Sequence, residues 1–212
     1  FGYADSVGMV RMTNLSAVAT LPGGAVRDPL PFRSALSSTG ARAGGDDTPT
    51  TELGRDGTKG FDGGTDDGGV GDTVSYAGSA AGVTVAVDAF TGVETLTGSA
   101  QADTLQGTGA GDTFTVDVAD GGDVGGIDFT SFENLDGLGG DDTFNMNAGL
   151  TGAVGVDGGA DGANGDVIVG TAAANAFVVD AADGGTVNLT TFTGVENLNG
   201  GAVGDPFQFP AA

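Results

Sequence analysis

The sequence predicts an all-β protein, a right-handed parallel β-solenoid or β-roll preceded by an irregular N-terminal region. Three observations support this fold class. A unit of 63 residues repeats without gaps, short alternating runs end at glycine-rich turns, and strong helix formers are nearly absent, with four Glu and one Lys in 212 residues. A pair of small Greek-key β-sandwiches is the alternative, because short strands spaced about 8–12 residues apart also suit that fold.

The composition predicts a thin core. Leu, Ile, Val and Phe make up 48 of the 212 residues, which is only just above the level at which a highly charged chain stays unfolded. Gly supplies another 43 residues. The chain is therefore expected to turn often and to bury small side chains.

Residues 1–64 are predicted to form the irregular N-terminal region. Two short strands are expected there, SVGMVRM at 6–12 and LSAVATL at 15–21. The prolines of VRDPLPF at 26–32 then forbid continuous regular structure. The repeat domain is predicted to span residues 65–212.

The repeat is clearest between residues 103–135 and 166–198. These segments share 17 identities in 33 positions, including the block FxVDxADGG. The same offset matches Phe144 to Phe207 further on, and a partial third copy begins at Asp72. Repetition at this scale predicts that successive copies stack along one axis.

Inside each unit the expected elements are short strands. Apolar residues alternate with small or polar residues in four segments, GVTVAVD at 82–88, DTFTV at 112–116, DTFNM at 142–146 and NAFVV at 175–179. Three further segments each place a glutamate two residues before a leucine, at Glu94, Glu133 and Glu196. One interpretation makes these segments strands whose leucines stack inside the protein, Leu96, Leu135 and Leu198. The other makes the glutamates metal ligands or salt-bridge partners between subunits.

The distribution of charge predicts the kind of partner. All six Lys and Arg residues lie in the first 60 residues, and the rest of the chain carries 23 acidic residues against no basic ones. Such a surface repels phosphate backbones and anionic lipids, so nucleic acid and membrane surfaces are not expected partners. No run reaches the length of apolar residues that spans a membrane, so membrane insertion is not expected. Multivalent cations are the partners expected for this negatively charged surface.

A shorter unit of nine residues lies within the repeat. GSAQADTLQ at 98–106 runs into GTGAGDTFT at 107–115, so two aspartates lie nine residues apart, each followed two positions later by an apolar residue. Related segments are GLGGDDTFN at 137–145 and DGANGDVIV at 161–169, and the repeat carries Asp142 onto a further aspartate. The candidate metal ligands are Asp103, Asp112, Asp141, Asp142, Asp166 and Asp205.

These segments resemble the hemolysin-type, or RTX, calcium-binding repeat, whose nonapeptide is G-G-x-G-x-D-x-U-x with U apolar. The resemblance covers about 140 of the 212 residues. It implies that each nonapeptide forms half a turn of a parallel β-roll, with U pointing inward and calcium bound between turns by the aspartate and by turn oxygens. No segment here matches all four fixed positions, since Leu138, Ser99 and Gln101 replace glycines and Asn175 replaces an aspartate.

Physical chemistry allows two roles for the turn aspartates. Calcium accepts carboxylate and backbone carbonyl oxygens, and glycine lets a turn aim its carbonyls at an ion. Alternatively, the aspartates cap turns by accepting backbone N–H bonds, as in Asx-turns. The sequence leaves both roles open.

The residues argue against an enzyme. The chain has no His and no Cys, so imidazole and thiolate chemistry are absent. The expected function is a non-enzymatic structural module of a secreted or cell-surface bacterial protein, stabilised by calcium at its Gly/Asp turns. The alternative is a self-assembling extracellular filament or surface-layer subunit, joined by strand addition or end-to-end stacking.

Overall fold

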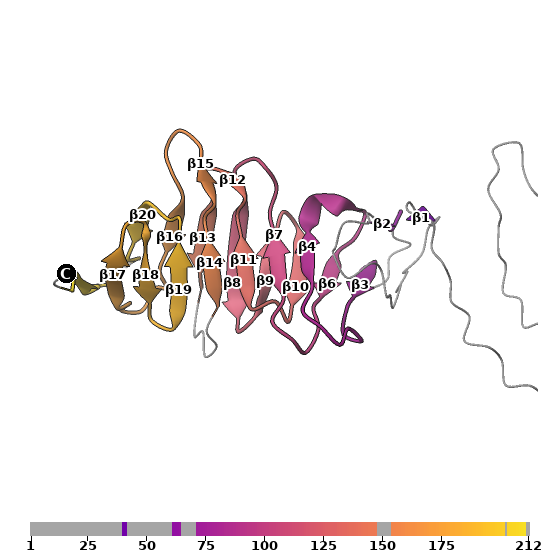
Figure 1. Ribbon diagram of the computed structural model, residues 1–212, viewed down its shortest axis with the longest axis horizontal. Helices are drawn as coiled ribbons and strands as arrows, with labels where there is room; N and C mark the ends of the chain where they lie inside the picture. The colour runs from indigo at the N-terminus through magenta and orange to yellow at the C-terminus, as the bar shows by residue number, and fades with distance from the viewer. Residues whose placement is uncertain (1–39, 42–60, 65–70, 148–153, 202, 211–212) are drawn as a thin grey trace, which may run out of the picture. The chain divides into compact units, whose positions relative to one another are not determined.

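The computed structural model describes residues 40–41, 61–64, 71–147, 154–201 and 203–210. These residues form an all-β structure without an α-helix, and the one helical turn among them is a short 3₁₀ segment, η1 (Val87–Ala89) (Figure 1). The strands expected at 6–12 and 15–21 lie outside the described residues, as does most of the predicted N-terminal region. The described part contains no long apolar helix of the kind that crosses a bilayer.

Two eight-stranded sheets make up most of the described structure. The first sheet has the order β3 (Thr73–Ser75), β6 (Thr95–Thr97), β10 (Ile127–Thr130), β9 (Gly121–Val124), β8 (Thr113–Val118), β13 (Thr143–Met146), β16 (Val167–Val169) and β20 (Asn197–Asn199). The second has the order β4 (Thr84–Ala86), β7 (Thr104–Gln106), β11 (Asn134–Asp136), β14 (Gly155–Asp157), β19 (Thr190–Thr193), β18 (Gly184–Val187), β17 (Phe177–Ala181) and β21 (Phe207–Gln208).

Two small sheets complete the arrangement. One contains β1 (Gly40–Ala41), β2 (Phe61–Asp62) and β5 (Phe90–Thr91), and the other pairs β12 (Gly139–Gly140) with β15 (Ala160–Asp161). All pairings in the small sheets are parallel.

The chain passes repeatedly between the two large sheets, and most neighbouring strands are parallel. In the first sheet Phe144 of β13 lies beside Phe114 of β8 and Ile168 of β16. Each large sheet also contains one antiparallel meander, β8–β9–β10 in the first and β17–β18–β19 in the second. Each meander begins within a copy of the block FxVDxADGG, so the repeated sequence builds the same local structure twice.

Equivalent strands of the two 63-residue copies lie in different large sheets. The meander of the first copy, β8–β9–β10, lies in the first sheet, whereas the equivalent meander of the second copy, β17–β18–β19, lies in the second sheet. Residues that are 63 positions apart therefore lie on opposite sides of the core. Both large sheets therefore contain strands from both copies (Figure 1). The copies do not form one separate β-sandwich each.

The prediction that Leu96, Leu135 and Leu198 stack on one another is wrong. Leu96 lies in the first sheet between Val74 and Phe129. Leu135 lies in the second sheet, and Leu198 lies in the first sheet beside Ile168. All three side chains face the core, but they do not stack on one another.

The core is a row of inward-facing apolar side chains contributed by both sheets. Phe114 and Phe144 are fully buried, and their rings stack with centroids 5.0 Å apart. Phe177 and Phe207 stack with centroids 4.5 Å apart. The residue that precedes many of these strands is acidic, and these acidic residues lie at the corners between the sheets.

Candidate metal centre

The corner acids form a ladder along the first sheet. Three hydrogen bonds join consecutive corners: Asp112 N–H donates to Oδ1 of Asp142 at 2.6 Å, Asp142 N–H to Oδ1 of Asp166 at 2.6 Å, and Asp166 N–H to Oε2 of Glu196 at 2.8 Å. We call these four residues the acidic ladder. Asp142, Asp166 and Glu196 each use one carboxylate oxygen to satisfy a backbone donor of the neighbouring turn, so like charges lie on adjacent turns.

Equivalent bonds occur at other corners. Val83 N–H donates to Oδ1 of Asp103, and Asp103 N–H donates to Oε2 of Glu133, each at 2.7 Å. Asp72 N–H donates to Oε2 of Glu94, also at 2.7 Å. The repeated glutamates therefore act as acceptors for the backbone of the preceding turn.

Two of the predicted ligands accept hydrogen bonds from donors of their own turns. Ser99 donates its backbone N–H and its hydroxyl to the carboxylate of Asp103. Thr108 likewise donates its N–H at 2.6 Å and its hydroxyl at 2.9 Å to Oδ2 of Asp112. At these corners the aspartate caps its own turn, which is the second of the two roles that the sequence left open.

Two other corners are built differently. Asp142 and Asp166 are fully buried, and Oδ2 of each makes no hydrogen bond to any described residue. Leu138 takes the place of the Ser or Thr at the Asp142 corner. A buried carboxylate oxygen without a partner is costly unless a proton or cation neutralises it.

Glycines bring backbone carbonyls close to these unpartnered oxygens. Oδ2 of Asp166 and the carbonyl oxygen of Gly194 lie 2.4 Å and 1.8 Å from the point that a Cβ of residue 158 would occupy. Similarly, Oδ2 of Asp142 and the carbonyl oxygen of Gly158 lie close to the point that a Cβ of residue 137 would occupy. A side chain at either glycine would fill the space around the carboxylate.

Asn175 shows which kind of group this space accepts. It occupies an equivalent corner, and its Nδ2 lies against Gly170 as Oδ2 of the aspartates lies against Gly137 and Gly158. There Nδ2 donates to the carbonyl oxygens of three residues, Thr171, Ala173 and Gly200, at distances of 2.7–3.1 Å. The corner therefore suits a positively polarised group, which a carboxylate oxygen alone does not supply.

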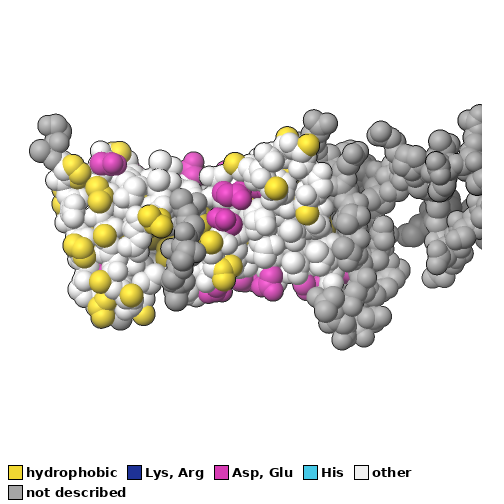
Figure 2. Space-filling model, turned by 90° about the horizontal axis from the view of Figure 1, so that it is seen from below, with side chains coloured by type: hydrophobic (Ala, Val, Ile, Leu, Met, Phe, Trp, Pro, Cys, Tyr) yellow, Lys and Arg dark blue, Asp and Glu magenta, His cyan; other side chains and the backbone are white. Residues whose placement is uncertain are grey.

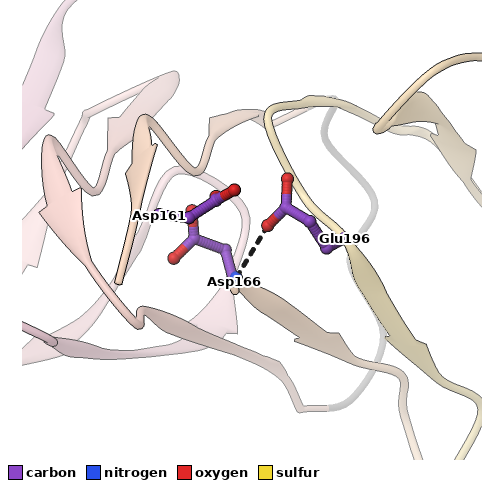
Figure 3. A group of neighbouring side chains, drawn as sticks. All are labelled: Asp161, Asp166 and Glu196. Atoms are coloured by element: carbon purple, nitrogen blue, oxygen red, sulfur yellow. Dashed lines mark hydrogen bonds between the residues drawn. The ribbon is translucent and has the colours of Figure 1, made fainter. Parts of the chain in front are cut away.

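One corner adds a third carboxylate. Carboxylate oxygens of Asp161, Asp166 and Glu196 lie within 4.8 Å of one another and could hold a metal ion (Figure 3). Asp161 is exposed and ends β15, whereas Asp166 is buried. The group thus joins a buried carboxylate that has one unpartnered oxygen to two carboxylates open to solvent.

An insertion supplies the extra ligand. Gly137 precedes Asp142 by five positions, whereas Gly158 precedes Asp166 by eight, so this corner has three additional residues. We call residues 159–165 the inserted loop. Asp161 was not among the predicted ligands, although this longer spacing is visible in the sequence. Glu196 had been expected either in a strand or as a metal ligand or salt-bridge partner between subunits, and it lies directly before β20 within the group.

The remaining predicted ligands have protein partners. Asp141 accepts three hydrogen bonds from the inserted loop, and the bond from the backbone N–H of Asn164 is the main cause that lowers its pKa. Oδ1 of Asp205 accepts the backbone N–H and the Nδ2 of Asn175, at 2.6 Å and 3.0 Å. Of the six predicted residues, only Asp166 belongs to the three-carboxylate group.

The electrostatics of the ladder favour a positive charge. The pKa of Asp142 is raised to about 6, mainly by burial and also by the charge of Asp166, while the hydrogen bond from the backbone N–H of Asp112 opposes the rise. Burial also raises the pKa of Asp166, and Glu196 adds to this effect. The described residues include no Lys, Arg or His, and the charged side chains that Figure 2 shows on one face are acidic.

Asp142 is expected to make the metal-free protein less stable as the pH rises. Its pKa is about 6 in the folded protein against an ordinary 3.8, so the folded state binds more protons between these values. The free energy of unfolding then falls as the pH increases through this window. Thermal midpoints in chelator should be higher at about pH 5 than at about pH 7, and Asp142→Asn should reduce the difference. A larger difference in the variant would contradict the assignment.

Comparisons with known proteins give no further guide. No family model, curated protein or solved structure matches this chain.

Proposed function

We propose that this chain is a non-enzymatic structural module of a secreted or cell-surface bacterial protein, and that calcium rigidifies it. In this proposal the two large sheets are the walls of a right-handed parallel β-solenoid of the RTX-like kind. The observation that carries the proposal is Asp166, a fully buried carboxylate with an oxygen unpartnered among the described residues, which lies beside Asp161 and Glu196.

Calcium fits this corner better than other common ions do. The group offers only carboxylates, and glycine-rich turns place backbone carbonyls nearby, which is the hard oxygen set that calcium prefers. Zinc usually takes nitrogen or sulfur ligands, and the chain has no His or Cys. Magnesium demands near-ideal octahedral geometry, whereas calcium tolerates an irregular turn.

The location outside the cell follows from the same chemistry. Extracellular modules bind calcium with dissociation constants of about 0.1–1 mM, which suits an environment rich in that ion. A chain without cysteine gains no stability from disulfides. A bound divalent cation would provide cross-links between turns in their place.

Thermal unfolding tests the proposal directly. An ion at about 100 times its dissociation constant stabilises a protein by roughly 2.7 kcal/mol, which for a chain of this size corresponds to a rise of about 5–11 °C. We expect circular dichroism to show this rise in millimolar calcium relative to chelator, with a smaller effect of magnesium. Identical midpoints in calcium and chelator would exclude calcium from the account.

A self-assembling subunit is the second candidate. Apolar side chains are exposed near the end of the described chain, with Phe207 at 42% and Phe209 at 72% exposure. Among the described residues, β20 and β21 lie at one edge of each large sheet, and edge strands can accept an added strand. Sedimentation velocity should then show association that Phe209→Ser reduces, whereas a monomer at high concentration would count against this candidate.

A further inference from the structure

We propose that Asp141 is a positioning residue, which holds the inserted loop in place and thereby sets the affinity of the cation site. The inference rests on the calcium site proposed above. It gives Asp141 a different role from the one expected from the sequence, in which it was a ligand.

The carboxylate of Asp141 is fully engaged by the inserted loop. Oδ1 accepts the backbone N–H groups of Asn164 and Gly165, both at 2.9 Å, and Oδ2 accepts Nδ2 of Asn164 at 2.8 Å. The Cβ of any residue at position 162 would lie 2.6 Å from Oδ1, so Gly162 permits this close approach. Because both oxygens already have donors, Asp141 is better suited to hold the loop than to bind an ion.

Other contacts hold the two ends of the loop, and Asp141 holds residues 164 and 165. Backbone bonds from Ala160 to Leu138 and from Gly162 to Gly140 hold the side of the loop that carries Asp161. On the opposite side, Nδ2 of Asn197 donates to the carbonyl oxygen of Asn164 at 3.0 Å. Asp141 of the preceding turn accepts the hydrogen bonds that Asn164 and Gly165 donate.

The position of the loop decides how the ligands meet. Asp161 lies within the loop, and Asp166 follows directly after Gly165, whose N–H is bound to Asp141. Releasing this N–H would loosen residues 164 and 165, which connect the strand that carries Asp161 to the buried Asp166. Side chains that orient metal ligands typically contribute about 10–100-fold to metal affinity.

Isothermal titration of the full chain with calcium tests the inference. An asparagine at position 141 has only one acceptor oxygen, so its amide nitrogen must face either Nδ2 of Asn164 or the backbone N–H groups of the loop. Calcium should therefore bind Asp141→Asn about tenfold more weakly. Asn164→Asp brings two carboxylates together and should also weaken binding. The double variant D141N/N164D exchanges donor and acceptor and should restore the affinity to within about twofold, a coupling that a double-mutant cycle measures.

Asp117→Asn is the matched control. Asp117 also accepts a hydrogen bond from an asparagine of another turn, Nδ2 of Asn147 at 2.7 Å, and this bond lies outside the inserted loop. A merely structural role of Asp141 would lower the thermal midpoint in chelator, as in the control, without changing the calcium affinity of the folded protein.

The possible outcomes separate the two proposals. Weaker binding by Asp141→Asn with rescue by the double variant supports the positioning role. Wild-type affinity in Asp141→Asn, or additive losses in the double variant, would overturn that role and leave the calcium site intact. Absence of calcium binding by the wild-type chain would overturn both. Asn164→Asp provides an independent test if Asp141→Asn does not fold.

Discussion

Asp166→Asn is expected to make the protein more stable in chelator and insensitive to calcium. The asparagine keeps an oxygen for the N–H of Asp142 and places an N–H₂ group against Gly158, near the carbonyl oxygen of Gly194. Asn175 already shows this arrangement at its own corner. Removing a buried, unpartnered acceptor should stabilise the fold by about 1–3 kcal/mol, which is a rise of roughly 2–12 °C in the thermal midpoint.

The same substitution at Asp103 is the matched control and should have the opposite sign. Both oxygens of Asp103 accept N–H groups, from Val83 and from Ser99, so an amide nitrogen there would face a donor. Asp103→Asn should therefore lower the midpoint in calcium and in chelator alike. A fall in the midpoint of Asp166→Asn in chelator, or a calcium response that survives in this variant, would contradict the account of the corner.

Phe144→Ala is expected to destabilise the protein more than any of the other substitutions. Phe144 is fully buried, and its ring stacks on Phe114 at 5.0 Å while Ile168 lies on its other side in the next strand. Truncating a buried phenylalanine costs about 3–5 kcal/mol. Urea unfolding should show this loss as a lower midpoint with an unchanged slope.

Phe207→Ala provides the comparison within the same chain. The repeat makes position 207 equivalent to position 144, but Phe207 is 42% exposed and stacks only on Phe177 among the described rings. Its truncation should cost clearly less, about 1–2 kcal/mol. Equal losses of stability at the two positions would contradict the expectation that the cost of truncation depends on how far neighbouring strands bury the ring.

Local sequence pattern predicted several of the strands. Each of the four alternating segments overlaps a strand in the structure, β4, β8, β13 or β17, and each of these strands buries an apolar side chain, which is Val85, Phe114, Phe144 or Phe177. The pattern identifies strands because one side of each is buried, which imposes a period of two residues. It cannot identify which strand lies beside which, so the three leucines were placed in one column although Leu135 lies in the second sheet and Leu96 and Leu198 have different neighbours in the first.

The antiparallel meanders were not predicted, because their middle strands look like turns. β9 and β18 begin with two glycines each, in GGDV and GGTV. The second glycine is required by packing, since a Cβ at Gly122 or Gly185 would lie within 2.0 Å of a carbonyl oxygen in the adjacent strand. Asp120 and Asp183 adopt positive φ angles of 55° and 52° in the preceding turns. The repeated ADGG block therefore encodes a tight turn and a close strand contact.

The candidate site was predicted in kind but not in detail. The nonapeptide pattern directed attention to turn aspartates, and Asp166 is both in that pattern and in the three-carboxylate group. The pattern could not separate a capped aspartate from an unpartnered one, because that depends on whether a Ser or Thr donor occupies the turn. Asp161 was missed because it lies in an insertion, where a fixed repeat length gives no assignment.

A crystal structure of the chain grown in calcium would test the central claim most directly. The account predicts an ion bound at about 2.3–2.6 Å from carboxylate oxygens, with Oδ2 of Asp166 among its ligands and Asp161 and Glu196 beside it. Oδ2 of Asp166 paired instead with a protein donor, and no ion at this corner, would contradict the proposal that the turns are held together by calcium.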